Sequence, residues 1–118
     1  MSRTPEGKIK DKVRDVLAEF EGSPHTVDTF IVKHLYQFWP VPGGFGASSL
    51  DALVTYRGMF IAIETKAPGK KPTPRQLLTI AQIEGAGGKV FVIDGDEGVL
   101  ALRTYLLQLR FRNANDSK

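Results

Sequence analysis

Residues 50–66, LDALVTYRGMFIAIETK, contain two largely apolar segments, 50–56 and 59–65, separated by Arg57 and Gly58. Apolar and β-branched runs of this length are typical of β-strands. Two such runs joined by two residues, one of them a glycine, predict a β-hairpin. We therefore expect this hairpin at the centre of the fold.

The second strand of the hairpin carries Glu64 and Lys66 near its end. Residues two apart on a strand share a face, so the two charges are expected to lie together. A carboxylate in an otherwise apolar strand needs a cation nearby, which either Lys66 or a metal ion supplies. Asp51 begins the preceding strand, and the hairpin allows it to come back beside Glu64.

Two converging carboxylates repel each other, and a hard divalent cation between them relieves the repulsion. Mg²⁺ accepts one or two carboxylates, keeps several waters and leaves positions for phosphate oxygens. Asp51 and Glu64 are thus candidate ligands of Mg²⁺. These residues alone leave an alternative open, in which Glu64 and Lys66 form a strand-end ion pair and Asp51 caps a turn.

Helices are predicted on both sides of the hairpin. Thr4 and Pro5 are typical of a helix N-cap and first turn, and apolar spacing extends this helix to about Phe20. The same pair of residue types recurs at Thr73 and Pro74, which begins a helix that ends at the glycines near residue 85. The remaining expected elements are a loop (21–29), a short helix (30–35), a strand (36–39), a buried strand (89–94) and a helix (99–111).

The composition is that of one ordinary globular domain. The chain has 118 residues, of which 42% are hydrophobic and 25% charged, so we expect a single domain over residues 1–112 and a flexible tail over 113–118. No cysteine, secretion signal or long apolar stretch is present, which favours a reducing, cytoplasmic setting. The net charge of +3 favours a polyanionic partner.

The run SSLDALVTYRGMFIAIETKAPGKKPTPRQ, residues 48–76, resembles the PD-(D/E)XK nuclease superfamily, and within it the small VRR-NUC type of phages and bacteria. The resemblance covers residues 5–94 and has one departure, since Leu50 stands where the superfamily usually has a proline before the aspartate. It implies an α/β fold with a restriction-endonuclease-like core. In that fold a mixed central sheet is flanked by helices, in the order α-β-β-β-α-β-α.

The resemblance also implies the site residues. Asp51, Glu64 and the backbone carbonyl of Thr65 would bind the metal ion, and Lys66 would orient or help deprotonate the attacking water. Gln76 would hydrogen-bond the lysine or the water. Glu6, in the first helix, would serve a second metal ion or its waters, although a first-turn acid is also favourable at a helix N-terminus without any metal. The sequence order of these candidates is Glu6, Asp51, Glu64, Thr65, Lys66, Gln76.

Lys70, Lys71 and Arg75 lie before or within the first turn of a helix, where free N–H groups favour anions, so they are candidate DNA contacts. The expected function is a Mg²⁺- or Mn²⁺-dependent endodeoxyribonuclease, selective for branched DNA such as a Holliday junction. We expect a homodimer that uses either the apolar terminal helix or the aromatic segment 36–39, with no membrane or nucleotide cofactor. The alternative is a non-catalytic DNA-binding module that keeps the fold.

Overall fold

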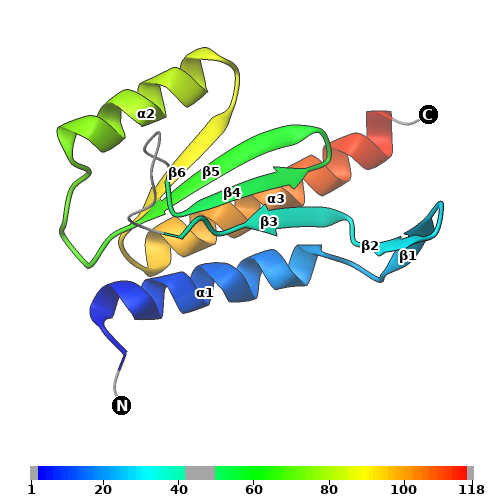
Figure 1. Cartoon of the computed structure of the whole chain (residues 1–118), viewed down its shortest axis with the longest axis horizontal. Coiled ribbons are helices and arrows are strands. Elements are labelled where there is room, and N and C mark those ends of the chain that lie inside the picture. Colours follow the sequence, from blue (N-terminus) through cyan, green and yellow to red (C-terminus); the bar gives the residue numbers. More distant parts are fainter. Residues whose placement is uncertain (1–2, 42–49, 117–118) are drawn as a thin grey trace.

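The computed structural model describes residues 3–41 and 50–116, and Figure 1 shows the arrangement of their helices and strands. In chain order the elements are α1 (Pro5–Phe20), β1 (His25–Val27), β2 (Phe30–Val32), β3 (Leu35–Phe38), β4 (Ala52–Tyr56), β5 (Met59–Thr65), α2 (Pro74–Gly85), β6 (Lys89–Ile93) and α3 (Asp96–Asp116).

The central sheet has the strand order β3-β4-β5-β6 within the described part of the chain. The pairs β3/β4 and β4/β5 are antiparallel, whereas β5 and β6 are parallel and are connected through α2. Apart from the small β1–β2 hairpin, the order is α-β-β-β-α-β-α, so the predicted α/β class is confirmed. This mixed sheet flanked by helices is consistent with a restriction-endonuclease-like core.

The predicted hairpin is formed by β4 and β5, with Tyr56 opposite Met59. Both residues of its turn have positive φ, 52° at Arg57 and 81° at Gly58. Positive φ at both central residues gives a turn whose twist matches that of the flanking strands. This turn fixes the register, which in turn decides which side chains meet at the far end of the two strands.

Helix capping confirms the two helix starts. The Thr4 hydroxyl accepts a hydrogen bond from the Gly7 N–H at the start of α1. At α2, the Thr73 hydroxyl accepts from the Gln76 N–H while the Gln76 side chain accepts from the Thr73 N–H. This reciprocal arrangement is a capping box, and it satisfies two backbone donors that the helix itself leaves unpaired.

The hydrophobic core lies between the sheet and the helices α1 and α3, which pack on the same face (Figure 1). The buried core positions are Ile9, Val13, Val16, Leu17, Phe20, Leu35, Ala52, Val54, Tyr56, Ile61, Ile63, Ile93, Leu102, Leu106 and Leu109. Along β5, Ile61 and Ile63 belong to this core, whereas Glu64 contacts Gln76 of α2, as the predicted period of two requires.

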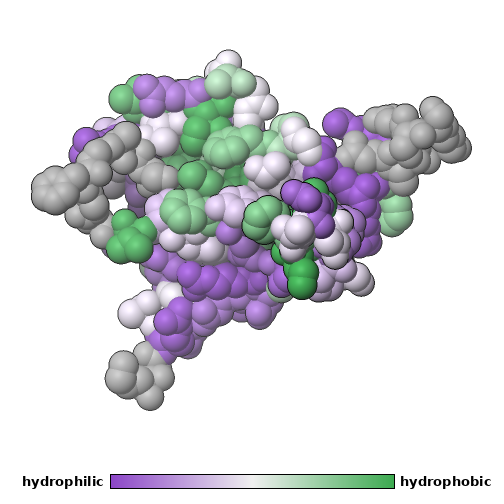
Figure 2. All heavy atoms as spheres, turned by 45° about the vertical axis from the view of Figure 1, so that its right-hand side comes forward, coloured by the Kyte–Doolittle hydropathy of each residue, from purple (hydrophilic) through white to green (hydrophobic). Residues whose placement is uncertain are grey.

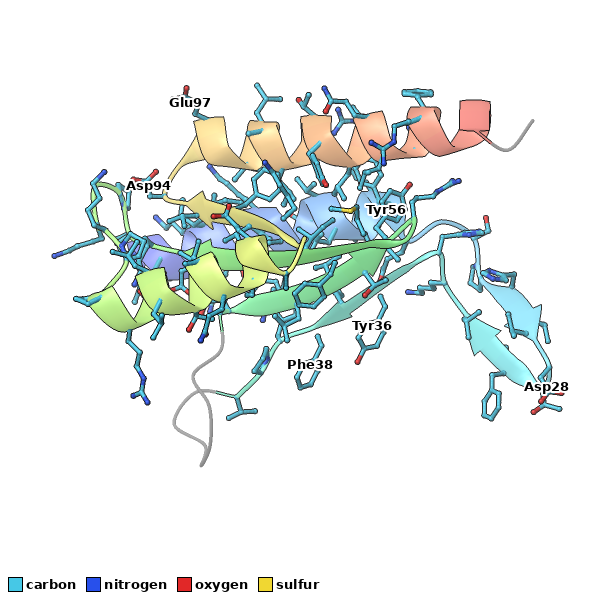
Figure 3. All side chains as sticks on the ribbon, turned by 90° about the horizontal axis from the view of Figure 1, so that it is seen from above. Asp28, Tyr36, Phe38, Tyr56, Asp94 and Glu97 are labelled. Atoms are coloured by element: carbon cyan, nitrogen blue, oxygen red, sulfur yellow. The ribbon has the colours of Figure 1, made fainter. Side chains whose placement is uncertain are left out.

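The opposite face of the sheet is covered less completely. The helix α2 lies over it but buries no residue fully. Tyr36 and Phe38 project from β3 on the side away from α3 (Figure 3), and they are 64% and 50% exposed. Figure 2 shows a largely apolar area between α2 and the β1–β2 hairpin. Val92 of β6 is 40% exposed, so the prediction that residues 89–94 form a fully covered strand is wrong.

The expected helix over residues 30–35 is also wrong. Phe30–Val32 instead forms a strand that pairs antiparallel with His25–Val27. The strand His25–Val27 lies within the stretch 21–29 that was expected to be a loop. Asp28 in its turn has a φ of 59°, which aspartate tolerates better than most residues. The short apolar period was compatible with either structure, and β-branched side chains favour the strand.

The terminal helix is longer than predicted. It begins at Asp96 rather than Val99 and continues to Asp116, into the stretch expected to be a tail. No helix within residues 3–41 and 50–116 is long and apolar enough to cross a membrane.

Candidate active site

Asp51 lies directly before β4, at the end of the sheet opposite the hairpin turn. Ala52 pairs with Ile63, so the next position places Asp51 across from Glu64. The Oδ2 atom of Asp51 accepts hydrogen bonds from the backbone N–H of Thr65, at 2.8 Å, and from the Thr65 hydroxyl, at 2.6 Å. These two bonds fix the carboxylate and leave Oδ1 available to other partners.

Thr65 closes this end of the sheet between Asp51 and β6. Its N–H points toward the β4 side, because it donates to Asp51. The next N–H, that of Lys66, donates to the carbonyl of Ile93 on the β6 side. Since the N–H and C=O of one strand residue point to the same side, the Thr65 carbonyl also faces the Asp51 side. Its predicted role as a metal ligand stays a prediction.

Glu64 is a buried carboxylate with only 4% exposure. Its Oε2 atom lies 3.4 Å from the Lys66 Nζ and accepts a 2.9 Å hydrogen bond from the Gln76 Nε2. Glu64 and Lys66 therefore form the contact that their spacing on the strand predicts. The ion pair is itself mostly buried, since the Lys66 side chain is 14% exposed.

The electrostatic environment works against ionisation of Glu64. Burial raises the pKa of its carboxyl group above the ordinary value, and the negative charge of Asp51 raises it further. Lys66 acts in the opposite direction but does not cancel the increase in the pKa. Two carboxylates whose charges oppose each other in a partly buried place are suited to a bound cation.

Gln76 lies in the first turn of α2 and was predicted to contact the lysine or a water. In the structure its amide nitrogen instead donates to Glu64, at 2.9 Å. The capping box determines this orientation, because the amide oxygen accepts the Thr73 N–H at 2.9 Å. The start of α2 is thereby connected directly to a candidate metal ligand.

Lys10 of α1 also reaches the site, and no sequence pattern predicts this contact. Its Nζ atom is 3.5 Å from Glu6 Oε2 and 3.9 Å from Asp51 Oδ1. Glu6 therefore lies beside a lysine, and its predicted metal role stays a prediction. The i,i+4 spacing of Glu6 and Lys10 was visible in the sequence, but the approach to Asp51 depends on how α1 packs against the sheet.

The candidate DNA contacts lie on the connection from β5 to α2 and at its end. Lys70, Lys71 and Arg75 are all exposed. Asp94, at the end of β6, lies beside this connection (Figure 3), and its Oδ2 atom accepts a 3.3 Å hydrogen bond from the Gly69 N–H. The loop that carries the two lysines is thus attached to the end of the sheet where Asp51 and Glu64 meet.

The donor set fits a hard divalent cation. Asp51 and Glu64 offer carboxylate oxygens that lie close to each other, and the Thr65 carbonyl points to the Asp51 side of its strand. Among residues 3–41 and 50–116, no group of three or more histidine, aspartate or glutamate side chains is placed to hold a metal ion. Two carboxylates with open positions for water and phosphate suit Mg²⁺, which seldom uses an all-protein cage.

Part of the chain is similar in sequence to a phage protein. The chain is 44% identical over 48 residues to "Putative nuclease p44" of Acyrthosiphon pisum secondary endosymbiont phage 1. The matching part is 40% of this chain, and it spans about half, 52%, of the length of the phage protein. No family model matches the chain.

Proposed function

We propose that the protein is a metal-dependent DNA endonuclease of the PD-(D/E)XK superfamily, of the VRR-NUC type. The observation that carries this proposal is the meeting of Asp51 and Glu64 at one end of the sheet, beside Lys66. The similarity to a phage protein named as a nuclease supports the nuclease part of the proposal. The metal requirement and the DNA substrate rest on the chemistry of the site.

Asp51, Glu64 and the Thr65 carbonyl would hold Mg²⁺ or Mn²⁺. The ion would supply an activated water and offset the negative charge of the scissile phosphate. The hydrogen bonds from Thr65 keep Oδ2 of Asp51 engaged, which leaves Oδ1 for the ion. Gln76 donates to Oε2 of Glu64, and the same carboxylate also accepts the backbone N–H of Asp51, so it is held in place beside Asp51.

Lys66 is the candidate for positioning the attacking water and for stabilising the charge that develops on the phosphate. Its ammonium group is held 3.4 Å from Glu64, next to the proposed ion, in a place where solvent screens charges weakly. Gln76 supports this arrangement indirectly, because it holds the carboxylate to which Lys66 is paired. A contact of Gln76 with the water remains part of the proposal.

Lys70, Lys71 and Arg75 would bind DNA phosphates next to the site. They are exposed and lie on a connection attached to the site through Asp94. Phosphate contacts fix the position of DNA without reading its sequence. We therefore propose selectivity for DNA shape, with branched DNA such as the four-way Holliday junction as substrate.

A homodimer would present two sites to two strands of such a junction. Of the two interfaces expected, we favour the aromatic segment 36–39, because it belongs to the edge strand β3, although the terminal helix also exposes Leu100 and Phe111. Leu102, Leu106 and Leu109 of the terminal helix are buried in the protein's own core, whereas Tyr36 and Phe38 are at least half exposed. We propose that the dimer forms through β3, and that the enzyme acts in the cytoplasm of a bacterium or an infected host.

The test is a cleavage assay with supercoiled plasmid and a synthetic four-way junction in Mg²⁺, Mn²⁺ or EDTA. Cleavage is expected with either metal and not with EDTA. Asp51→Asn and Lys66→Met should each lower the rate by about 100-fold or more, because each removes a group that acts on the reacting phosphate or its ion. Asp15→Asn is the matched control, since Asp15 is an exposed acid on α1.

Two results would contradict the proposal. Retarded DNA bands without cleavage in any metal would identify the protein as a non-catalytic DNA-binding module. Equal loss of cleavage in Asp15→Asn would show that the assay reports the loss of surface charge rather than of the site. Circular dichroism of each variant establishes that the fold is intact.

A further inference from the structure

Lys10 connects the first helix to the carboxylate end of the sheet. It lies one helical turn after Glu6, and its ammonium group is 3.5 Å from Glu6 Oε2 and 3.9 Å from Asp51 Oδ1. The Lys10 side chain is only 28% exposed, and that of Asp51 is 24% exposed. One lysine thus stands between acids from two separate elements.

We propose that Lys10 supplies a second positive charge to the active site, in the role that a second metal ion would otherwise have. In this arrangement Glu6 pairs with Lys10 and does not bind a metal ion. This inference rests on the proposed nuclease function and assigns it a single metal ion per site. Lys10 is a positioning and charge-stabilising residue that acts through Asp51 and the bound phosphate.

The distribution of acids supports a single ion. Within the part of the chain that the structure describes, no third acidic side chain joins Asp51 and Glu64 to form a cluster able to hold a metal. Glu6 is the acid on α1 that was predicted to serve a second metal ion. Its carboxylate is paired with Lys10. A partly buried ammonium with carboxylates on two sides is compensated in charge, so it remains in place without an ion.

The position of Lys10 relative to Asp51 makes it possible to distinguish an effect of the lysine's charge from an effect of its packing. Thr65 donates to Oδ2 of Asp51, whereas Lys10 lies near Oδ1. Oδ1 is the oxygen proposed to bind the ion. Lys10 therefore repels the ion and attracts the phosphate. Removing its charge should strengthen metal binding while it slows cleavage, and these opposite effects would not follow from loss of packing.

The experiment measures Mn²⁺ binding by isothermal titration calorimetry without DNA, and cleavage at saturating Mn²⁺. Wild type is expected to bind one ion per chain. Lys10→Gln should bind one ion about 3- to 10-fold more tightly, because a repelling charge is removed. Its cleavage rate should fall about 10- to 100-fold. Lys8→Gln is the matched control, since Lys8 is an exposed lysine on the same helix.

Glu6→Gln completes the test. If Glu6 holds Lys10, this variant still binds one ion. Two ions in wild type, reduced to one by Glu6→Gln, would overturn the inference. Unchanged or weaker Mn²⁺ binding by Lys10→Gln with an intact thermal transition would overturn it as well. Binding of no ion by wild type would instead contradict the proposed function itself, and this inference with it.

Discussion

The amide nitrogen of Gln76 donates a 2.9 Å hydrogen bond to Glu64, while the amide oxygen of the same side chain caps its own helix at the Thr73 N–H. One side chain therefore does two things. It stabilises the start of α2, and it orients a buried carboxylate on β5. Because both ends of the amide are occupied, the helix start and the candidate metal site are positioned relative to each other.

Gln76→Glu separates these two roles. Glutamate also caps a helix from this position, so the cap should survive. It cannot donate to Glu64, and it adds a negative charge there. We expect cleavage to fall about 100-fold, as for loss of one aligned donor. Gln76→Ala should lose the cap as well, with an additional cost of about 1 kcal/mol in the free energy of unfolding.

The measurements for Gln76 are cleavage rates at saturating metal and urea unfolding in EDTA. Gln82→Glu serves as the control, because Gln82 is exposed on the same helix. Wild-type cleavage by Gln76→Glu would show that the hydrogen bond to Glu64 has no part in the reaction.

Glu64 gives a prediction on pH. Its pKa is raised in the folded protein, mainly by burial and then by the charge of Asp51, so the folded state binds this proton more tightly than the unfolded state does. The stabilising contribution of the protonated group is present at low pH and is lost as the pH rises through the folded-state pKa. At neutral pH without metal, Glu64→Gln should therefore be more stable than wild type.

Chemical unfolding in EDTA at about pH 8 and about pH 5 checks this, because protonation of the Glu64 carboxyl group increases toward the lower pH. The difference in the free energy of unfolding between Glu64→Gln and wild type should be smaller at the lower pH. Added Mg²⁺ should stabilise wild type and not the variant, because an ion that binds only the folded state raises its stability. A variant less stable than wild type at the higher pH would show that pairing with Lys66 outweighs the cost of burial.

Much of the fold could be predicted because its signals are local. The β4–β5 hairpin follows from Arg57 and Gly58 between two apolar runs, and the helix starts follow from Thr4 and Thr73. The β1–β2 hairpin could not be predicted in the same way. Its strands are three residues long and nearly all exposed, so no core-facing period marks them.

The contacts of the candidate site could likewise be predicted only where they depend on local sequence. The contact of Glu64 with Lys66 follows from strand alternation, and Asp51 reaches Glu64 through the hairpin register. The contacts of Lys10 and Asp94 depend instead on where α1 and β6 are placed by packing across the whole domain. Spacing along the chain contains no information on such contacts.

The basic loop leads to a prediction on salt dependence. If Lys70 and Lys71 each contact a phosphate, Lys70→Gln and Lys71→Gln together should reduce the slope of log affinity against log salt by about two. Binding is measured by fluorescence anisotropy with a labelled junction in EDTA, which prevents cleavage. Lys8→Gln should leave the slope unchanged, since Lys8 lies on α1, outside this loop. An unaltered slope in the double variant would show that Lys70 and Lys71 do not contact DNA phosphates.

The exposed aromatic side chains of β3 lead to a prediction on oligomeric state. Tyr36 and Phe38 project from an edge strand on the same side of the sheet (Figure 3), and they are 64% and 50% exposed. Apolar surface next to an unpaired strand edge is a site for association. We therefore expect wild type to sediment at twice the monomer mass, and Tyr36→Ser with Phe38→Ser to sediment as a monomer.

Leu100→Ser is the control for the β3 variant, because Leu100 is 62% exposed on α3, the other interface considered. If the dimer forms through β3, the Leu100 variant remains a dimer. Since all the proposed site residues come from one chain, the monomeric β3 variant should still nick plasmid DNA in Mg²⁺. It should lose paired cleavage of the two strands of a junction, because that requires two sites held together. A dimer that persists in the β3 variant and dissociates in Leu100→Ser would move the interface to α3.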